Sequence, residues 1–563
     1  MTQSTHSTCL ALGLRADPGT VPLLIGVIGH RDPLPTEIPR IVKQFELLLE
    51  RIIEACPSTP IWMLNGLAEG MDSIAAETFL TRARLALASD DKHEQSSIRD
   101  KLIAVLPKNR EEYSKDFGSK AAKQKLQKLL DESDTILDPS NSHELRNSFD
   151  AALSEPECYA IQGEFVAKYS YILFAFFDGI DTGRIGGTAH TLAIHQGNIH
   201  PLFRSAEEVL RSREEGEAVI IDTPRICNAS QREPRQNQQI SQQLSTGILE
   251  TCRYLDSINV NISNISFRPT QYDEIEGPFT KLWSYSDRVA GFWKKRYEKI
   301  AILLVIMGFL LVATVDFYGK ASAFGWGLVF VAFSIFPAIQ KKLQKPFLTH
   351  RCLTESLTIQ YIWSANDIKA STADLLFSHD QDDIARIRVL LRTVTLQLMI
   401  IGKSEQAEPE ESLTKSRIWI RGQIVFLSKR VGSFKSLSKR WKAIAYLFAG
   451  GGIASASINL IPIGIAPPEY VVNVLLAGFT SSLAYQELMG YKQTYERYEI
   501  SLRQFERAYA ALSYLDDGHT HYLEETLDSH FRYKLVLDAI GKEKIDELNE
   551  WMSNQLEKSY QPA

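Results

Sequence analysis

Three glycine-rich segments, each directly after a short apolar run, are the residues best suited to chemistry in this sequence. They are residues 26–32 (GVIGHRD), 65–72 (NGLAEGMD) and 178–190, which contains Gly186, Gly187 and Thr188. A glycine that follows a β-strand lets the backbone approach a phosphate closely, and a helix that begins there offers free amide groups to an anion. Together, the three segments predict a site for a phosphate-bearing, nucleotide-like ligand.

Polar side chains in these segments add groups that such a ligand needs. Arg31 carries a guanidinium fork that suits phosphate or carboxylate. Glu69 and Asp72 suit ribose hydroxyl groups, although Asp72 equally suits the cap of the helix that follows. The predicted ligand-binding residues are Gly29, His30, Arg31, Gly66, Glu69, Gly70, Asp72, Asp178, Gly179, Gly186, Gly187 and Thr188.

Short apolar runs are expected to form the strands that position these segments. They lie at residues 23–28, 61–65, 102–106, 171–177 and 218–221, with amphipathic helical segments such as 38–55 and 73–87 between them. This alternation predicts a parallel sheet with helices on both faces. In such a sheet the glycine-rich turns share the carboxyl edge, where ligands bind.

The overall composition limits the class of protein. A chain of 563 residues is too long for one domain, and its net charge of −6 gives no general attraction to nucleic acid polymers. The six cysteines form neither a CxxC pair nor a Cys/His cluster, so we expect no structural metal and no disulfide framework. Residues 1–20 are polar without a signal-peptide pattern, and we expect a flexible N-terminus.

Four apolar blocks in the second half predict membrane insertion. They are residues 300–315, 321–339, 443–465 and 471–485, and the short turns 316–320 and 466–470 divide them into two transmembrane hairpins. The first and fourth blocks are at or below the lower limit of the ~17–25 residues that span a bilayer. Basic residues flank the bases of both hairpins, which predicts a multi-pass protein with cytoplasmic N- and C-termini.

These patterns predict an α/β Rossmann-like N-terminal domain followed by an all-α membrane region with four transmembrane helices and long cytosolic helices. The expected divisions are 21–225 for the ligand-sensing domain, 226–285 for a linker with a helix, 286–401 and 402–515 for the two hairpins, and 516–563 for C-terminal helices. The second hairpin is the more polar, and its pore candidates are Ser455, Asn459, Asn473 and Ser481, with close helix packing as the alternative. A pore of short helices needs several copies, so a homo-oligomer is expected.

The motifs resemble the SLOG superfamily, a Rossmann-like group that includes the LOG phosphoribohydrolases, the DprA/Smf proteins and the ligand-sensing regions of TRPM channels. The resemblance covers about residues 21–225 and rests on GVIGHR, GLAEGMD, VLP with EEY, and FFDG followed by GGT, in that order. The hairpin half is similar, in architecture only, to SLATT membrane effectors.

The resemblance implies a membrane effector of a bacterial anti-phage defence system. In that case the protein senses a nucleotide-derived second messenger, such as a cyclic nucleotide or an ADP-ribose derivative, and permeabilises the inner membrane. The alternatives are a membrane-anchored LOG-type nucleotide hydrolase, a TRPM-like ligand-gated ion channel and a scaffold that binds a protein partner. LOG enzymes carry a glutamate in their glycine-rich loop, whereas the segment here offers only His190, with Glu69 or Glu164 as substitutes. We therefore predict no catalytic residue.

Overall fold

The computed structural model describes most of the chain and divides it into two compact units. The described residues are 20–89, 100–139, 154–197, 216–228, 244–264, 278–314, 320–368, 370–376, 381–404, 409–459, 468–516 and 529–558. The first unit contains Met1–Tyr285 and Lys369–Glu405, and the second contains Ser286–Ile368 and Gln406–Ala563.

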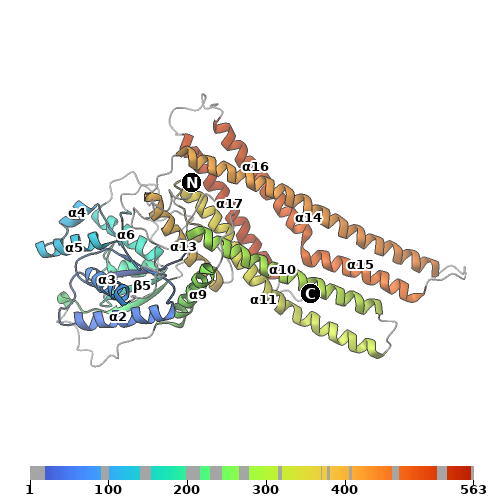
Figure 1. Cartoon of the computed structure of the whole chain (residues 1–563), viewed down its shortest axis with the longest axis horizontal. Helices are drawn as coiled ribbons and strands as arrows, with labels where there is room; N and C mark the ends of the chain where they lie inside the picture. Colours follow the sequence, from blue (N-terminus) through green and yellow to red (C-terminus); the bar gives the residue numbers. More distant parts are fainter. Residues whose placement is uncertain are drawn as a thin grey trace. The chain divides into compact units, whose positions relative to one another are not determined.

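The first unit is built on a six-stranded sheet, one strand of which, β5, is labelled in Figure 1. The strand order is β4-β3-β2-β1-β5-β6, and every neighbouring pair is parallel. The strands are β1 (Leu23–Gly29), β2 (Ile61–Asn65), β3 (Lys101–Val105), β4 (Thr135–Leu137), β5 (Ile172–Phe177) and β6 (Glu217–Asp222). Five of them lie where the apolar runs predicted strands. The three-residue β4 is an addition, because so short a strand leaves no periodic pattern in the sequence.

Helices cover both faces of this sheet because the central strands carry apolar side chains on both sides. Phe174 and Phe176 of β5 contact Phe45 of α2 (Ile38–Ala55) on one face, with ring centroids 5.0 and 5.4 Å apart. Leu173 of β5 belongs to a cluster on the other face with Phe165 of α6 (Glu155–Tyr169). The further helices of this unit are α3 (Met71–Ser89), α4 (Arg110–Lys115), α5 (Lys120–Glu132), α7 (Thr188–His195), η1 (Ile226–Asn228) and α9 (Thr246–Ser263).

Two helices from much later in the chain complete the first unit. α13 (Gln381–Ser404) contributes Leu396 and Ile400 to the cluster that contains Phe165. The short α12 (Thr372–Leu375) carries Asp374, whose carboxylate lies 2.7 Å from Lys168 of α6. The same carboxylate lies 3.3 Å from Arg392 of α13. This buried ionic cluster therefore holds α12 and α13 on α6.

The second unit is made of long helices. They are α10 (Pro278–Thr314), which begins in the first unit, α11 (Lys320–Ala365), α14 (Pro409–Asn459), α15 (Glu469–Met489), α16 (Tyr491–Asp516) and α17 (Ser529–Lys558). α14 packs along both α15 and α16 (Figure 1). α11 packs on α17, where the indole N–H of the fully buried Trp363 donates to the Leu537 carbonyl oxygen at 3.1 Å.

The structure contradicts the predicted membrane region. None of the described helices combines the length and the apolar character that a membrane span requires. The predictions of four transmembrane helices and of a multi-pass inner-membrane location are corrected accordingly. The described parts of the blocks at 300–314 and 471–485 are shorter than the ~20 residues of a span, and their helices continue into charged residues. Residues 315–319 and 460–467, which include the end of the predicted block 443–465, lie outside the described residues, as do most side chains of 321–339.

The four pore candidates lie on two neighbouring helices of the second unit. Ser455 is half-buried on α14, and Asn473 and Ser481 are half-buried on α15. Asn459 is the last residue of α14, and its side chain lies outside the described residues. Because none of the described helices meets the requirements of a membrane span, we no longer expect these residues to line a pore.

Candidate functional site

The sheet has a topological switch point beside β1. The chain proceeds from β1 through β2 and β3 to β4 on one side, and then crosses to β5 and β6 on the other. β1 therefore lies between β2 and β5, and Gly29 at its end is paired with Phe176. In parallel α/β sheets, ligands bind outside the carboxyl ends of the strands at this point. All three predicted turns follow strands β1, β2 and β5.

The turn after β2 is fastened to the turn after β1. The backbone N–H of Met71 donates to the His30 carbonyl oxygen at 3.0 Å. Gly70, with a φ of +96°, allows this approach, because a Cβ atom there would lie 2.5 Å from the carbonyl oxygens of both His30 and Arg31. The sequence-predicted residues Gly29, His30, Arg31, Gly70 and the following Asp72 are thus brought together.

Asp72 is a buried carboxyl group that lies between the first two turns, near the positive charge of Arg31. Its side chain is 7% exposed and reaches within 3.4 Å of where Cβ atoms on Gly29 and Gly66 would lie. Burial raises the pKa of Asp72 to about 7, against the opposing charge of Arg31. Its Oδ1 atom has no hydrogen-bond partner among the described residues. Asp72 is inside the first turn of α3, which begins at Met71, so it does not occupy the N-cap position.

Arg31 lies beside an aromatic ring that the sequence analysis did not single out. Its guanidinium carbon is 5.1 Å from the centroid of the Tyr159 ring, and the Lys108 amine is 5.5 Å from the same centroid. The Tyr159 hydroxyl donates to Asp116 at 2.6 Å. Burial, together with this hydrogen bond, raises the pKa of Tyr159 to about 12, so the phenol keeps its proton at neutral pH.

His30 connects the turn after β1 to the turn after β5. The backbone N–H of Asp178 donates to His30 Nε2 at 3.1 Å, and Oδ1 of Asp178 lies 3.1 Å from the same nitrogen. Burial lowers the pKa of His30, although the neighbouring Asp178 opposes this shift. Burial thus favours the neutral imidazole, whose tautomer sets whether Nε2 accepts from the Asp178 N–H or donates to Oδ1.

The Asp178 carboxylate accepts hydrogen bonds that hold its own turn in place. Burial raises the pKa of Asp178, but this effect is outweighed by the N–H of Ile180, by His30 and by the Asn228 amide, and the pKa lies below its ordinary value. The N–H of Ile180 donates to Oδ1 at 3.0 Å and the Asn228 amide donates to Oδ2 at 2.9 Å. Asp178 therefore positions the turn rather than offering an acceptor to a ligand.

The third turn packs on α6 next to Tyr159. Gly186 has a φ of +75°, and a Cβ atom there would lie 2.7 Å from Cβ of Tyr159. Gly187 is the N-cap of α7, and Thr188 is its first residue. The turn that leads into α7 therefore packs on α6 at Tyr159, the residue whose ring Arg31 contacts.

Two predicted site residues do not take part in the contacts between the three turns. Glu69 is exposed, and Gly179, with a φ of +83°, has open space where a Cβ atom would lie. Glu164, which could replace the catalytic glutamate of LOG enzymes, is buried on α6. The candidate site thus consists of the turns after β1 and β2, the start of α7, and the face of α6 that carries Tyr159.

Four residues near the site were missed. They are Lys108, Tyr113, Tyr159 and Gln162. The Tyr113 hydroxyl donates to the Gly66 carbonyl oxygen at 2.9 Å, and a Cβ atom on Gly66 would lie 2.0 Å from the Gln162 amide nitrogen. Tyr113 is part of the EEY motif behind the SLOG resemblance. The other three residues had no signal in the sequence, because only the fold brings them to the sheet edge.

Within the described part of the chain, no three His, Cys, Asp or Glu side chains are grouped so that they could hold a metal ion. Two surface pockets are lined by other residues, one by Lys442 and its neighbours in the second unit and one by Lys120 and its neighbours on α5. We nevertheless place the site at the edge, because it gathers the buried carboxyl, the guanidinium and the glycine turns. No protein-family model and no curated protein matches the chain.

Proposed function

We propose that the first unit binds a nucleotide-derived ligand at the carboxyl edge of its sheet and acts as a sensor. The observation that carries this proposal is the Arg31 guanidinium near Asp72, a buried carboxyl between the glycine turns of β1 and β2. Among the described residues, Oδ1 of Asp72 has no hydrogen-bond partner. A guanidinium and free helix amides suit a phosphate group. A partly protonated carboxyl suits a ribose hydroxyl or a phosphate oxygen.

The charge balance supports a ligand with few phosphate groups. Arg31 and Lys108 lie on the same tyrosine ring, but Lys108 is already paired with Asp116 at 2.9 Å and with Glu155 at 2.8 Å. Arg31 is therefore the main cation available to the ligand. A mononucleotide, a cyclic dinucleotide or ADP-ribose fits this balance better than a nucleoside triphosphate does. The SLOG resemblance supports a place for such sensing in anti-phage signalling.

Titration calorimetry of the purified chain with ADP-ribose, cyclic di-AMP and AMP tests the proposal. We expect at least one of the three to bind with a stoichiometry near one per chain. The variant Arg31→Gln is expected to bind about tenfold more weakly or worse, because it loses a charge-assisted hydrogen bond. Arg110→Gln is the matched control, since Arg110 is exposed and pairs with Asp131 on the surface. Equal affinities for the two variants, or no binding of any of the three, would refute the proposed site.

A second candidate function is hydrolysis of the same ligand. A carboxyl group with a pKa of about 7 is suited to general acid–base catalysis, and Asp72 is the described residue that favours this reaction. Chromatography of the calorimetry samples distinguishes the two functions. Binding without product supports a sensor. Product that disappears in Asp72→Asn, while ligand binding is retained, supports a hydrolase.

A further inference from the structure

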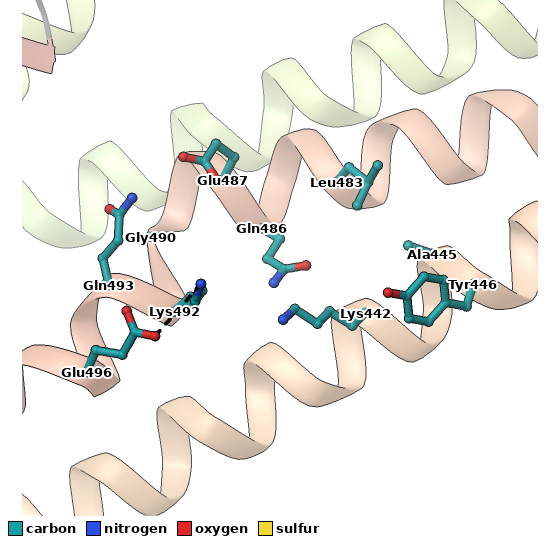
Figure 2. A pocket seen from close by; sticks show the side chains of 10 residues that line it. All are labelled: Lys442, Ala445, Tyr446, Leu483, Gln486, Glu487, Gly490, Lys492, Gln493 and Glu496. Carbon is teal, nitrogen blue, oxygen red and sulfur yellow. Dashed lines mark ion pairs between the residues drawn. The ribbon is translucent and has the colours of Figure 1, made fainter. Parts of the chain in front are cut away.

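A pocket of about 490 Å³ lies in the second unit, where α15 ends and α16 begins. α15 ends at Met489, Gly490 adopts a left-handed conformation with a φ of +58°, and α16 starts at Tyr491. Figure 2 shows the pocket between these two helices and α14. Its volume is within the range of small-molecule sites, roughly 300–1,000 Å³.

One part of the pocket wall offers positive charge. Figure 2 shows the Lys442 amine and the Gln486 amide pointing into the space between the helices. Lys442 has no ion pair or hydrogen bond among the residues that the structure describes. Lys492 pairs with Glu496 only at 3.8 Å, and both side chains are about half exposed, so this ion pair contributes little. Gly490 and the first residues of α16, Lys492 and Gln493, line the same pocket.

Another part of the wall is apolar. Ala445, Leu483 and the ring of Tyr446 line it. Leu483 is 43% exposed and Tyr446 is 72% exposed, which is high for large side chains with apolar surface. A ligand that covers them removes this surface from water. Glu487 and Glu496 also line the pocket, and their charge disfavours a ligand with several negative charges.

We propose that this pocket binds an organic monoanion, with one carboxylate or similar group and a short apolar part. The anionic group lies between Lys442 and Lys492, and the apolar part lies against Tyr446 and Leu483. Such a ligand contacts α14, α15 and α16 together, so it holds the junction at Gly490 in one conformation. The pocket belongs to the second unit, and this inference does not depend on the nucleotide site.

Octanoate is the probe, with octylammonium as its cationic counterpart and inorganic phosphate as a head group without an apolar part. We expect calorimetry to show one octanoate per chain and no comparable binding of the other two. Lys442→Met should weaken octanoate binding about tenfold. Lys439→Met is the matched control, because Lys439 is exposed on the same helix but does not line the pocket, and it should change the affinity less than twofold.

Hydrogen exchange provides a second measurement that depends on the location of the probe. Octanoate should slow exchange of the amides at 490–494 in the wild type and in Lys439→Met, but not in Lys442→Met. Two results would overturn the proposal. One is equal binding of octanoate and octylammonium, which indicates apolar contact alone. The other is equal octanoate affinity of the two lysine variants, which excludes Lys442 as a ligand-binding group.

Discussion

The carbonyl oxygen of His30 accepts a hydrogen bond from the backbone N–H of Met71 at 3.0 Å, and this contact fixes the ends of β1 and β2 to each other. Because Asp72 follows Met71, the same contact places its carboxyl beside Gly29 at the end of β1. The site geometry therefore depends on a close approach of two backbone segments rather than on a contact between side chains.

Gly70→Ala is expected to disturb this approach. A Cβ atom there would collide with two carbonyl oxygens, and the φ of +96° is strained for alanine, so unfolding free energy should fall by about 2 kcal/mol or more. Ligand affinity should fall as well. Gly118→Ala is the control, because nothing lies within 4 Å of its Cβ position, and its stability should change by less than about 0.5 kcal/mol. Urea unfolding measures both, and equal stability of the two variants would contradict the packing argument.

Asp72 should make the stability of the first unit depend on pH. Its pKa is about 7 in the folded chain and near the ordinary value of 3.8 when unfolded. Between about pH 4 and pH 7 the folded state therefore holds a proton that the unfolded state releases, and stability decreases as the pH rises through this window. The loss is at most about 4 kcal/mol. Asp72→Asn should lack this dependence, as measured by urea unfolding at several pH values.

Glu69→Gln serves as the control for that measurement, because Glu69 is an exposed carboxylate on the same turn. It should retain the pH dependence of the wild type. The affinity for a phosphate-bearing ligand should also decrease above pH 7 in the wild type, since the ionised Asp72 repels the phosphate. An Asp72→Asn profile identical to that of the wild type would show that Asp72 does not titrate in this range.

The buried ionic cluster on α6 predicts a large effect of a single substitution. Asp374→Ala leaves Lys168 and Arg392 buried without their shared carboxylate, and breaking a buried ion pair in this way costs about 3–5 kcal/mol. Asp131→Ala removes an exposed ion pair with Arg110 and should cost far less, because water screens that pair. Denaturant unfolding of both variants gives the comparison. Similar small losses would show that α12 and α13 do not depend on the cluster.

The sequence predicted the sheet well because its strands follow simple patterns. Residues 61–65 and 38–55 match β2 and α2 at both ends, since apolar periodicity and flanking turn residues mark them clearly. The glycine turns were found for the same reason. Tyr159 was not, because an aromatic residue within a helix is typical of a core position, and only the fold brings it beside Arg31.

Long-range packing explains what the sequence could not predict. The apolar face of α13 contacts Phe165 more than two hundred residues earlier in the chain, and no local pattern identifies such a partner. The apolar blocks were interpreted as membrane spans because hydropathy alone cannot distinguish a span from an apolar stretch of a longer helix. The helices around these blocks extend into charged segments, as in α14, which begins at Pro409.

Two helix glycines in the second unit should respond in opposite ways to alanine. Gly541 of α17 faces the buried Trp363, and a Cβ atom there would lie 2.5 Å from the indole nitrogen. Gly541→Ala should therefore lower the unfolding free energy by about 1–3 kcal/mol, because the core cannot accept the added methyl group. Gly432→Ala, on an exposed part of α14 with open space at its Cβ position, should raise it by about 0.5–1 kcal/mol. Thermal and urea unfolding of both variants show whether each change raises or lowers the free energy of unfolding. Stabilisation by Gly541→Ala would contradict the close packing of α11 on α17.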